Sequence, residues 1–442
     1  MQAVSIRRQV ISNIIPAIII ELMVLIYNLA DTFFIAQTHD PLQIAAVSLA
    51  APVFMVLISA GIIFMAGSMS FISRLLGAEQ TERANNAASF CVWAGLVTGA
   101  VLAVVFTCFV GTILHAIGAS PETFSLAESY LNIVMLSAPL IVFSMASGGI
   151  MRAENHPSAA MVGQVIGNML NVVLDPVMIL WFGWGIKGAA IATSVSIVIG
   201  ALYYAGYFLL GRSSLSIHIK NFRANDGIAW GVFGIGIPSC LDPFLMSISQ
   251  MVVNSLMSAY GDMAVAATGV AMRINQITGL VAMGAGQGVQ PLLGFCVGAE
   301  TWERYRAILN FALRFSVSMS VLIMAVCYVF TDDIVGVFLT HPEAFEYAVV
   351  FVRILLLTGI TFSIFFMFVN ALQAMGAGKA SLILSVCRQC VIYVPMMFLL
   401  NRLLGASGII WALPAAEVIS LTQTATFYGK IIFHPKYLTH SE

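Results

Sequence analysis

The sequence predicts an all-α integral membrane protein with twelve transmembrane helices in two six-helix lobes, related by a pseudo-twofold axis along the membrane normal. Three observations lead to this prediction: the composition, the series of long apolar segments and an internal repeat. The 442 residues are 60% hydrophobic and 9% charged, with a mean hydropathy of +0.97. A soluble protein has about 25% charged residues, so lipid is the expected surroundings of most of this surface.

A helix of about 20 apolar residues spans the hydrocarbon core of a bilayer. Twelve segments meet this requirement, and the breaks between them are short. They lie at about 10–36, 44–73, 86–115, 124–150, 157–182, 187–211, 229–260, 263–297, 306–331, 345–372, 378–401 and 407–431.

The two halves of the sequence repeat each other at an offset of about 221 residues. "GAEQTER" at 77–83 recurs as "GAETWER" at 298–304, and Pro16 has a counterpart in Pro238. The longest polar break separates the sixth and seventh segments. We therefore predict an N-terminal lobe at 1–211, a cytoplasmic linker at 212–227 and a C-terminal lobe at 228–442. Because six spans per repeat is an even number, both halves should point the same way, with a substrate cavity between them.

Lysine and arginine set the expected orientation. If both termini are cytoplasmic, fourteen of these residues fall on inside loops and helix ends, against two outside, Lys187 and Arg402. We expect a multi-pass protein of the plasma membrane, which in a bacterium is the inner membrane.

Several functional classes are disfavoured. A net charge of −1 argues against nucleic acid as a partner. Cys387 and Cys390 form a CxxC within an apolar segment, where structural thiols are the better interpretation. The glycine-rich stretches at 284–291 and 376–379 lack the strand context of a phosphate-binding loop. The sequence therefore predicts neither an enzyme nor a bound cofactor. Without a nucleotide-binding domain, transport should be driven by an ion gradient.

Carboxylates within membrane spans indicate function by default. In the fifth span, Gln164, Asn168, Asn171 and Asp175 are spaced to fall within an arc of about 60° on one helix face. Lipid cannot satisfy these polar groups, so the stripe should face another helix.

In the first span, Asn13, Glu21, Asn28 and Asp31 likewise share a face, within about 80°. Asp31 and Asp175 belong to the same lobe, and two carboxylates with amide neighbours suit a proton or a small hard cation. The alternative is hydrogen bonding between helices without transport. The second half has no acidic counterpart of this pair, since Asp31 aligns with Val253 or Asn254 and Asp175 roughly with Val394. That asymmetry favours a single ion site.

Glu21 and Asp242 are related by the repeat offset, and each follows a helix proline. They could flank the cleft and attract cationic substrates. Alternatively, one or both could pair with a buried arginine such as Arg273 or Arg388. For Glu417, in the last span, packing or pairing is the better interpretation. Candidate substrate-cleft residues are Glu21, Asn28, Asn168 and Asp242.

The chain resembles the multidrug and toxic compound extrusion family along its whole length. The resemblance depends on several features in order: Pro16 followed by "Asp31-Thr32-Phe33", "GAE" after the second and eighth spans, Asn171-x3-Asp175-Pro176, and "GAAIAT" at 188–193. Members similar to this chain hold H⁺ or Na⁺ in the N-terminal lobe. The resemblance implies that Asp31, Asn171, Asp175 and Thr193 take this role here, and that Pro16 is a helix kink. Asp242 lies too soon after Pro238 to match the glutamate that another branch carries in the seventh span.

The function expected from residues and resemblance together is secondary active efflux of cationic or amphipathic organic compounds in exchange for H⁺ or Na⁺. The protein should work as a monomer in the bilayer. The first alternative is a lipid-linked oligosaccharide flippase of the same architecture, which would favour an arginine- and lysine-rich cleft for pyrophosphate. The second is a membrane enzyme such as a polyprenyl transferase, which would need catalytic clusters on loops that are short here.

Overall fold

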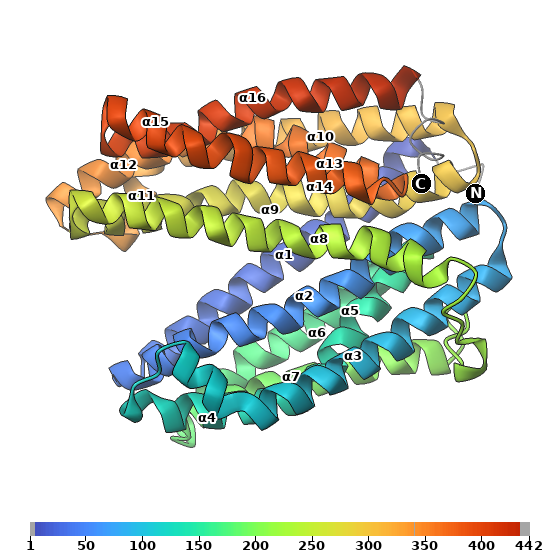
Figure 1. Ribbon diagram of the computed structural model, residues 1–442, viewed down its shortest axis with the longest axis horizontal. Helices are drawn as coiled ribbons and strands as arrows, with labels where there is room; N and C mark the ends of the chain where they lie inside the picture. The colour runs from blue at the N-terminus through green and yellow to red at the C-terminus, as the bar shows by residue number, and fades with distance from the viewer. Residues whose placement is uncertain (1–4, 340, 434–442) are drawn as a thin grey trace. The chain divides into compact units, whose positions relative to one another are not determined.

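The computed structural model describes residues 5–339 and 341–433, and within these ranges every regular element is a helix (Figure 1). The helices form two compact units. We call Ile19–Ile237 the N unit, and Met1–Ile18 together with Pro238–Glu442 the C unit. The chain passes from one unit to the other inside two helices, α1 and α8.

The N unit packs α2 and α3 against α5, α6 against α7, and α4 against α2 and α7. Two clusters of buried side chains, rich in alanine, valine and isoleucine, fill the spaces between these helices. The helices are α1 (Ile6–Ala36, from Ile19), α2 (Pro41–Gly77), α3 (Thr81–Ala116), α4 (Pro121–Leu136), α5 (Ala138–Ala153), α6 (Pro157–Asp175), the π-helix η1 (Pro176–Trp181), α7 (Gly185–Leu209) and the 3₁₀ turn η2 (Ile219–Asn221).

In the C unit, α9 packs against α10, α12 and α13, and α15 packs against α16. Val10 and Ile14 of α1 belong to the same buried cluster as side chains of α9, α10 and α13. The helices are α8 (Ile228–Met257, from Pro238), the 3₁₀ turn η3 (Ser258–Tyr260), α9 (Asp262–Gly298), α10 (Trp302–Val329), α11 (Thr331–Phe338), α12 (Pro342–Leu356), α13 (Gly359–Ala374), α14 (Gly378–Val386), the π-helix η4 (Cys387–Tyr393), α15 (Val394–Leu404) and α16 (Ala406–Phe433).

The predicted division at residues 212–227 separates the two sequence repeats, but the packing units divide the chain differently. The first part of α1 belongs to the C unit, and the first part of α8 belongs to the N unit. Glycines at equivalent positions of the two repeats contact these helix parts. A Cβ on Gly288 of α9 would meet the Asn13 carbonyl oxygen at 2.7 Å, and one on Gly67 of α2 would meet the Val232 carbonyl. Only glycine allows such close backbone contact. Gly67 and Gly288 are 221 residues apart, the repeat offset.

Nine helical segments of the described chain are long and apolar enough to span a membrane, and two bent helix pairs raise the number to eleven. α16 has 28 residues, long enough for a further span. These segments follow the twelve predicted ones in order. Several helices begin earlier than predicted, such as α1 at Ile6 and α3 at Thr81, because polar first turns extend the apolar runs.

The predicted spans 124–150 and 345–372 are each broken, which corrects the expectation of continuous helices. α4 and α5 meet at 49°, and α12 and α13 meet at 45°. The first break lies at Ser137, just before Pro139, which has no N–H to donate. The second lies at Leu357 and Thr358, and the Thr358 hydroxyl donates to the Leu355 carbonyl at 2.7 Å. The repeat offset relates Ser137 to Thr358, so both halves share the bend. In addition, the short helix α11 follows α10, where no separate helix was predicted.

The repeated "GAE" motif is a helix stop. Glu79 and Glu300, which follow α2 and α9, have φ values of 60° and 53°. After α2, the Ala78 N–H donates to Arg74 and the Gln80 N–H to Leu75, which satisfies carbonyls at the helix end. The repeat of this motif is thus explained by chain geometry.

Candidate functional site

The polar stripe of the fifth span is buried in the N unit, as its one-sided spacing predicted. Asn168, Asn171 and Asp175 of α6 are 9%, 2% and 0% exposed. Asp175 is the last residue of α6 and adjoins η1. π-Helical turns widen a helix locally and are frequent at functional sites.

Asn171 connects the stripe to α7. Its Nδ2 lies 3.3 Å from Asp175 Oδ1 and 3.3 Å from Thr193 Oγ1. Thr193 is 4% exposed. The structure therefore brings Asn171, Asp175 and Thr193 together, three of the four residues that the resemblance implied for ion binding.

Asp31 on α1 completes the group, since it is close enough to Asp175 for the two to interact electrostatically. Tyr27, one turn earlier on α1, lies within hydrogen-bonding reach of Thr193 and interacts with both carboxylates. Tyr130 of α4 also interacts electrostatically with Tyr27, Asp31 and Asp175. Sequence reasoning missed both tyrosines. The four-residue spacing of Tyr27 and Asp31, which places them on one helix face, was the available signal.

The chemistry of this cluster follows from its unused oxygens. Asp31 Oδ1, Asn171 Oδ1 and Asp175 Oδ2 are buried and have no hydrogen-bond partner among the described residues. All three are acceptors, and a buried acceptor without a hydrogen-bond donor is costly. A proton would supply the missing donor, and a hard cation such as Na⁺ prefers oxygen ligands of this kind. Among the residues that the structure describes, no three His, Cys, Asp or Glu side chains form a group that could hold a metal ion.

The predicted cleft residues differ in their surroundings. Glu21 interacts electrostatically with Arg152, a buried arginine on α5 that sequence reasoning did not consider. Asn28 is exposed. Asn168 Oδ1 accepts a hydrogen bond from Gln164 Nε2 at 3.2 Å within the same helix. Pro16 lies inside α1, which is helical on both sides of it, two residues before the chain leaves the C unit.

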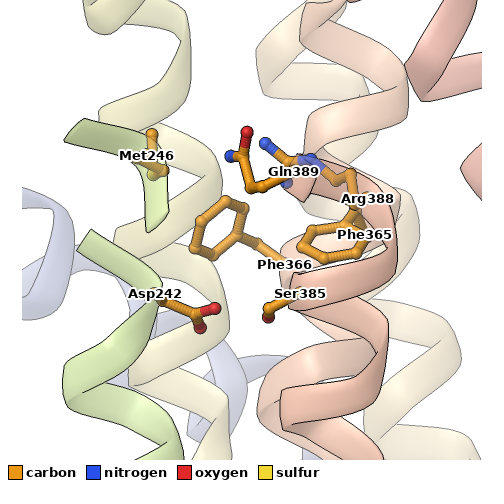
Figure 2. A pocket seen from close by; sticks show the side chains of 7 residues that line it. All are labelled: Asp242, Met246, Phe365, Phe366, Ser385, Arg388 and Gln389. Atoms are coloured by element: carbon orange, nitrogen blue, oxygen red, sulfur yellow. The ribbon is translucent and has the colours of Figure 1, made fainter. Parts of the chain in front are cut away.

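Asp242 lines a small pocket within the C unit (Figure 2). Its carboxylate, on α8, points toward Ser385 on α14, and Met246, Phe365, Phe366, Arg388 and Gln389 form the remaining walls. Arg388 is close enough to Asp242 for electrostatic attraction. Arg388 also forms an ion pair with Glu417, with 3.1 Å between Nε and Oε1. The prediction that Glu417 packs or pairs is therefore confirmed.

Comparison with known proteins identifies this architecture. Residues 16–177 and 238–399 each match the model of the MatE family, and each match begins at one of the two repeat-related prolines. The chain belongs to the MatE family. It is 32% identical over 403 residues to the multidrug export protein MepA of Staphylococcus aureus strain MSSA476, with 91% of this chain and 89% of that protein covered. MepA of Staphylococcus haemolyticus is also 32% identical, over 409 residues.

Solved structures of other transporters share the fold. An outward-facing multidrug resistance transporter of the MOP superfamily superimposes with a TM-score of 0.93 and 25% identity, covering 97% of this chain and 96% of that chain. A MOP superfamily transporter from Pyrococcus furiosus, described as having a binding pocket of reverse polarity, gives 0.89 and 25%, with 97% of both chains covered. These matches confirm the predicted family and the all-helical membrane fold with about twelve spans. The MatE protein is a transporter and not an enzyme.

Proposed function

We propose that this MatE protein is a secondary active multidrug antiporter, which exports cationic or amphipathic organic compounds in exchange for H⁺ or Na⁺. The observation that supports this most directly is the group of three unpartnered acceptor oxygens on Asp31, Asn171 and Asp175. Two like charges held together in a buried site are stabilised by a bound cation. The multidrug export proteins at 32% identity support the drug side of the exchange.

The coupling requires only that ion and drug favour different conformations. H⁺ or Na⁺ binds at Asp31 and Asp175, with Asn171 and Thr193 as further oxygen donors, and favours release of drug to the outside. Departure of the ion to the cytoplasm then favours uptake of new drug. A helix proline removes one backbone hydrogen bond, so Pro16 gives α1 a place to bend during this cycle.

Glu21, Asn28, Asn168 and Asp242 are the proposed substrate contacts. Asp242 lines a small pocket with Met246, Phe365 and Phe366, and a substrate cation there would compete with Arg388 for its carboxylate. Asn28 is exposed and free to meet a ligand. Glu21 is already attracted to Arg152, so a substrate cation would compete with that arginine.

We place the transporter in the plasma membrane, with both termini cytoplasmic and the monomer as the working form. Each lobe supplies its own polar cluster from residues of one chain, so no second copy is needed to complete a site.

The test is transport by purified protein in liposomes, with pH and Na⁺ gradients imposed separately. We expect Asp31→Asn and Asp175→Asn each to abolish uptake of a fluorescent organic cation, because the amide cannot take up H⁺ and binds Na⁺ poorly. Asp333→Asn, on an exposed face of α11, is the control and should transport normally. Wild-type rates from both site variants, or transport that neither gradient drives, would refute the ion site.

The lipid-linked oligosaccharide flippase remains the alternative function. A pyrophosphate carrier needs free cationic side chains in its cleft, whereas Arg388 is engaged by Glu417. Translocation of a labelled lipid pyrophosphate in the same liposomes, with no organic cation transport, would favour the flippase.

A further inference from the structure

The ion pair of Arg388 and Glu417 lies outside the proposed ion site, and both of its side chains are buried. The two side chains are 4% and 1% exposed. The guanidinium carbon of Arg388 lies 4.2 Å from the ring centre of Phe365, 4.9 Å from that of Phe362 and 5.9 Å from that of Phe366. Three aromatic faces and a carboxylate therefore enclose this cation, as in protein sites that bind organic cations.

Glu417 depends on Arg388 for its charge balance. Neither Glu417 oxygen has a conventional hydrogen bond among the described residues. Among the described residues, two further titratable groups interact with this pair: Asp242 of α8 faces Arg388, and Tyr393 of η4 interacts with both members. Arg388 is thus the cation that neutralises Glu417.

The repeat places this pair beside the equivalent of the ion site. An offset of 221 relates Gly167 to Arg388 and Ser196 to Glu417. Gly167 lies one helical turn before Asn171 on α6, and Ser196 lies nearly one turn after Thr193 on α7. Both units thus place a polar cluster on the same pair of helices, and in both the first helix of the pair contains a π-helical turn.

The two clusters differ in whether the protein itself supplies a cation to the buried carboxylate. In the N unit, the carboxylates keep unpartnered oxygens. In the C unit, the carboxylate is paired with an arginine of the same chain. We propose that Arg388 is a tethered cation, which permanently occupies in the C unit the place that an exchangeable ion takes in the N unit. Its presence keeps Glu417 from binding H⁺ or Na⁺ and limits the transporter to one exchangeable ion site.

Removal of the tethered charge should convert Glu417 into a second cation site. A buried carboxylate without a counter-ion becomes neutral by taking up a proton. The first experiment is an infrared pH titration of purified protein in the Asp31→Asn/Asp175→Asn background. We expect Arg388→Gln to add a titrating signal of a protonated carboxylic acid, which disappears when Glu417→Gln is added. Arg388→Lys, which keeps the charge, should show no new signal. Asp242 also faces Arg388, so any signal that Arg388→Gln adds and that persists in Arg388→Gln/Glu417→Gln belongs to Asp242 and does not support the proposal.

Thermal unfolding gives a second readout that does not depend on transport. If Glu417 must be protonated in the folded Arg388→Gln variant, this variant should become more stable as the pH falls, relative to Arg388→Gln/Glu417→Gln. Arg353→Gln is the matched control, because Arg353 belongs to the same unit but forms an exposed pair with Asp332. The proposal is wrong if Arg388→Gln shows no Glu417-dependent titration, if Arg388→Lys gains the same signal, or if low pH gives no relative stabilisation.

The inference rests on the proposed ion coupling for its functional meaning, so transport is measured as well. The transport rate of Arg388→Gln should depend more steeply on the H⁺ or Na⁺ concentration than that of wild type. Adding Glu417→Gln to this variant should restore the wild-type dependence. If wild-type transport needs neither ion, the antiport proposal fails, while the infrared titration still decides the role of Arg388.

Discussion

Asn171 connects the parts of the candidate ion site, because its amide contacts Asp175 and Thr193 through one nitrogen and leaves its oxygen unused. The carboxylates supply negative charge, and the asparagine and threonine fix their spacing without adding more. A site of this kind can hold one cation without accumulating the repulsion that a third carboxylate would bring.

Thr193→Val should weaken ion coupling without unfolding the protein. Valine has a similar volume but no hydroxyl, so the Asn171 amide loses an acceptor and the Tyr27 hydroxyl loses a neighbour. An unmet buried donor costs about 1–3 kcal/mol. We expect the H⁺ or Na⁺ concentration for half-maximal transport to rise by about tenfold in the liposome assay. Ser196→Ala is the control, since the Ser196 hydroxyl donates to the Ala192 carbonyl of its own helix. An equal effect in both variants would mean that Thr193 has only a packing role.

The sequence identified the carboxylates and amides of the candidate ion site more readily than the side chains around them. Asp175 and Asn171 stand out because polar side chains are rare in an apolar span. Tyr27 and Tyr130 do not, because tyrosine suits lipid, cleft and core alike. Arg152 was missed as a partner of Glu21 because spacing within one helix says nothing about which other helix lies opposite.

Among the helices, the bends of the fourth and tenth spans show how the same geometry arises from different residues. Pro139 marks the first bend in the sequence, whereas the second, at Leu357 and Thr358, has no proline. A long apolar run predicts that a helix crosses the membrane, but not that it is straight, because bending depends on packing against neighbours. This explains why the number and order of spans could be predicted from the sequence and the two breaks could not.

Gly288→Ala should loosen the contact between α1 and α9. The added Cβ would lie 2.7 Å from the Asn13 carbonyl oxygen and 2.8 Å from the Ile14 Cα, and a backbone cannot yield as a side chain can. Overpacking of this kind costs about 1–3 kcal/mol. We expect a lower unfolding temperature for purified protein.

The control for this change is Gly206→Ala on α7, where a Cβ would meet no atom within 4 Å. Both substitutions bring the same gain in helix propensity, up to about 1 kcal/mol. The difference between them therefore measures the clash alone. Equal unfolding temperatures would show that α1 and α9 separate enough in solution to accommodate a methyl group.

In the molecule as a whole, the segment between the repeats is fastened to the N unit. Glu154, after α5, accepts hydrogen bonds from the Ser213 hydroxyl at 2.8 Å and from the backbone N–H groups of Ser214 and Leu215 at 2.8 and 3.0 Å. Trp93 donates to the Ile217 carbonyl at 3.0 Å. The linker is therefore a fixed strap that leads into the first part of α8.

Glu154→Gln should release this strap. The amide cannot accept three donors on one oxygen and still satisfy its own N–H groups, so charge-assisted bonds worth about 1.5–3 kcal/mol each are weakened. We expect trypsin to cleave faster after Lys220 and Arg223, and gel electrophoresis measures the cleavage rate. Glu122→Gln, an exposed change at the start of α4, should leave the cleavage rate unchanged. No acceleration in Glu154→Gln would show that the remaining contacts are sufficient to hold the strap.

The side of the membrane on which this strap lies follows from the lysine and arginine bias. With fourteen such residues assigned inside and two outside, the rule predicts that 212–227 lies in the cytoplasm. Trypsin should therefore cut after Lys220 in inside-out vesicles and not in right-side-out vesicles. Cleavage confined to right-side-out vesicles would reverse the predicted orientation.

Sequence comparison within the chain predicted the duplication but not the exchange of helix parts between units. The repeat offset relates Pro16 to Pro238, and the unit boundaries fall at Ile18 and Ile237, next to these prolines. The partner of each exchanged part lies more than 100 residues away along the chain, so local pattern carries no trace of it.

This exchange has a consequence for how the protein is made. Val10 and Ile14 leave the ribosome nearly 280 residues before their buried neighbours Val289 and Leu293. At a synthesis rate of about 5–20 residues per second, roughly 15–55 s pass between synthesis of the start of α1 and synthesis of the part of α9 that packs against it. α1 can therefore insert into the membrane long before α9 is available to pack against it. During that interval the apolar face of residues 6–18 is open to lipid, to other nascent chains and to membrane chaperones.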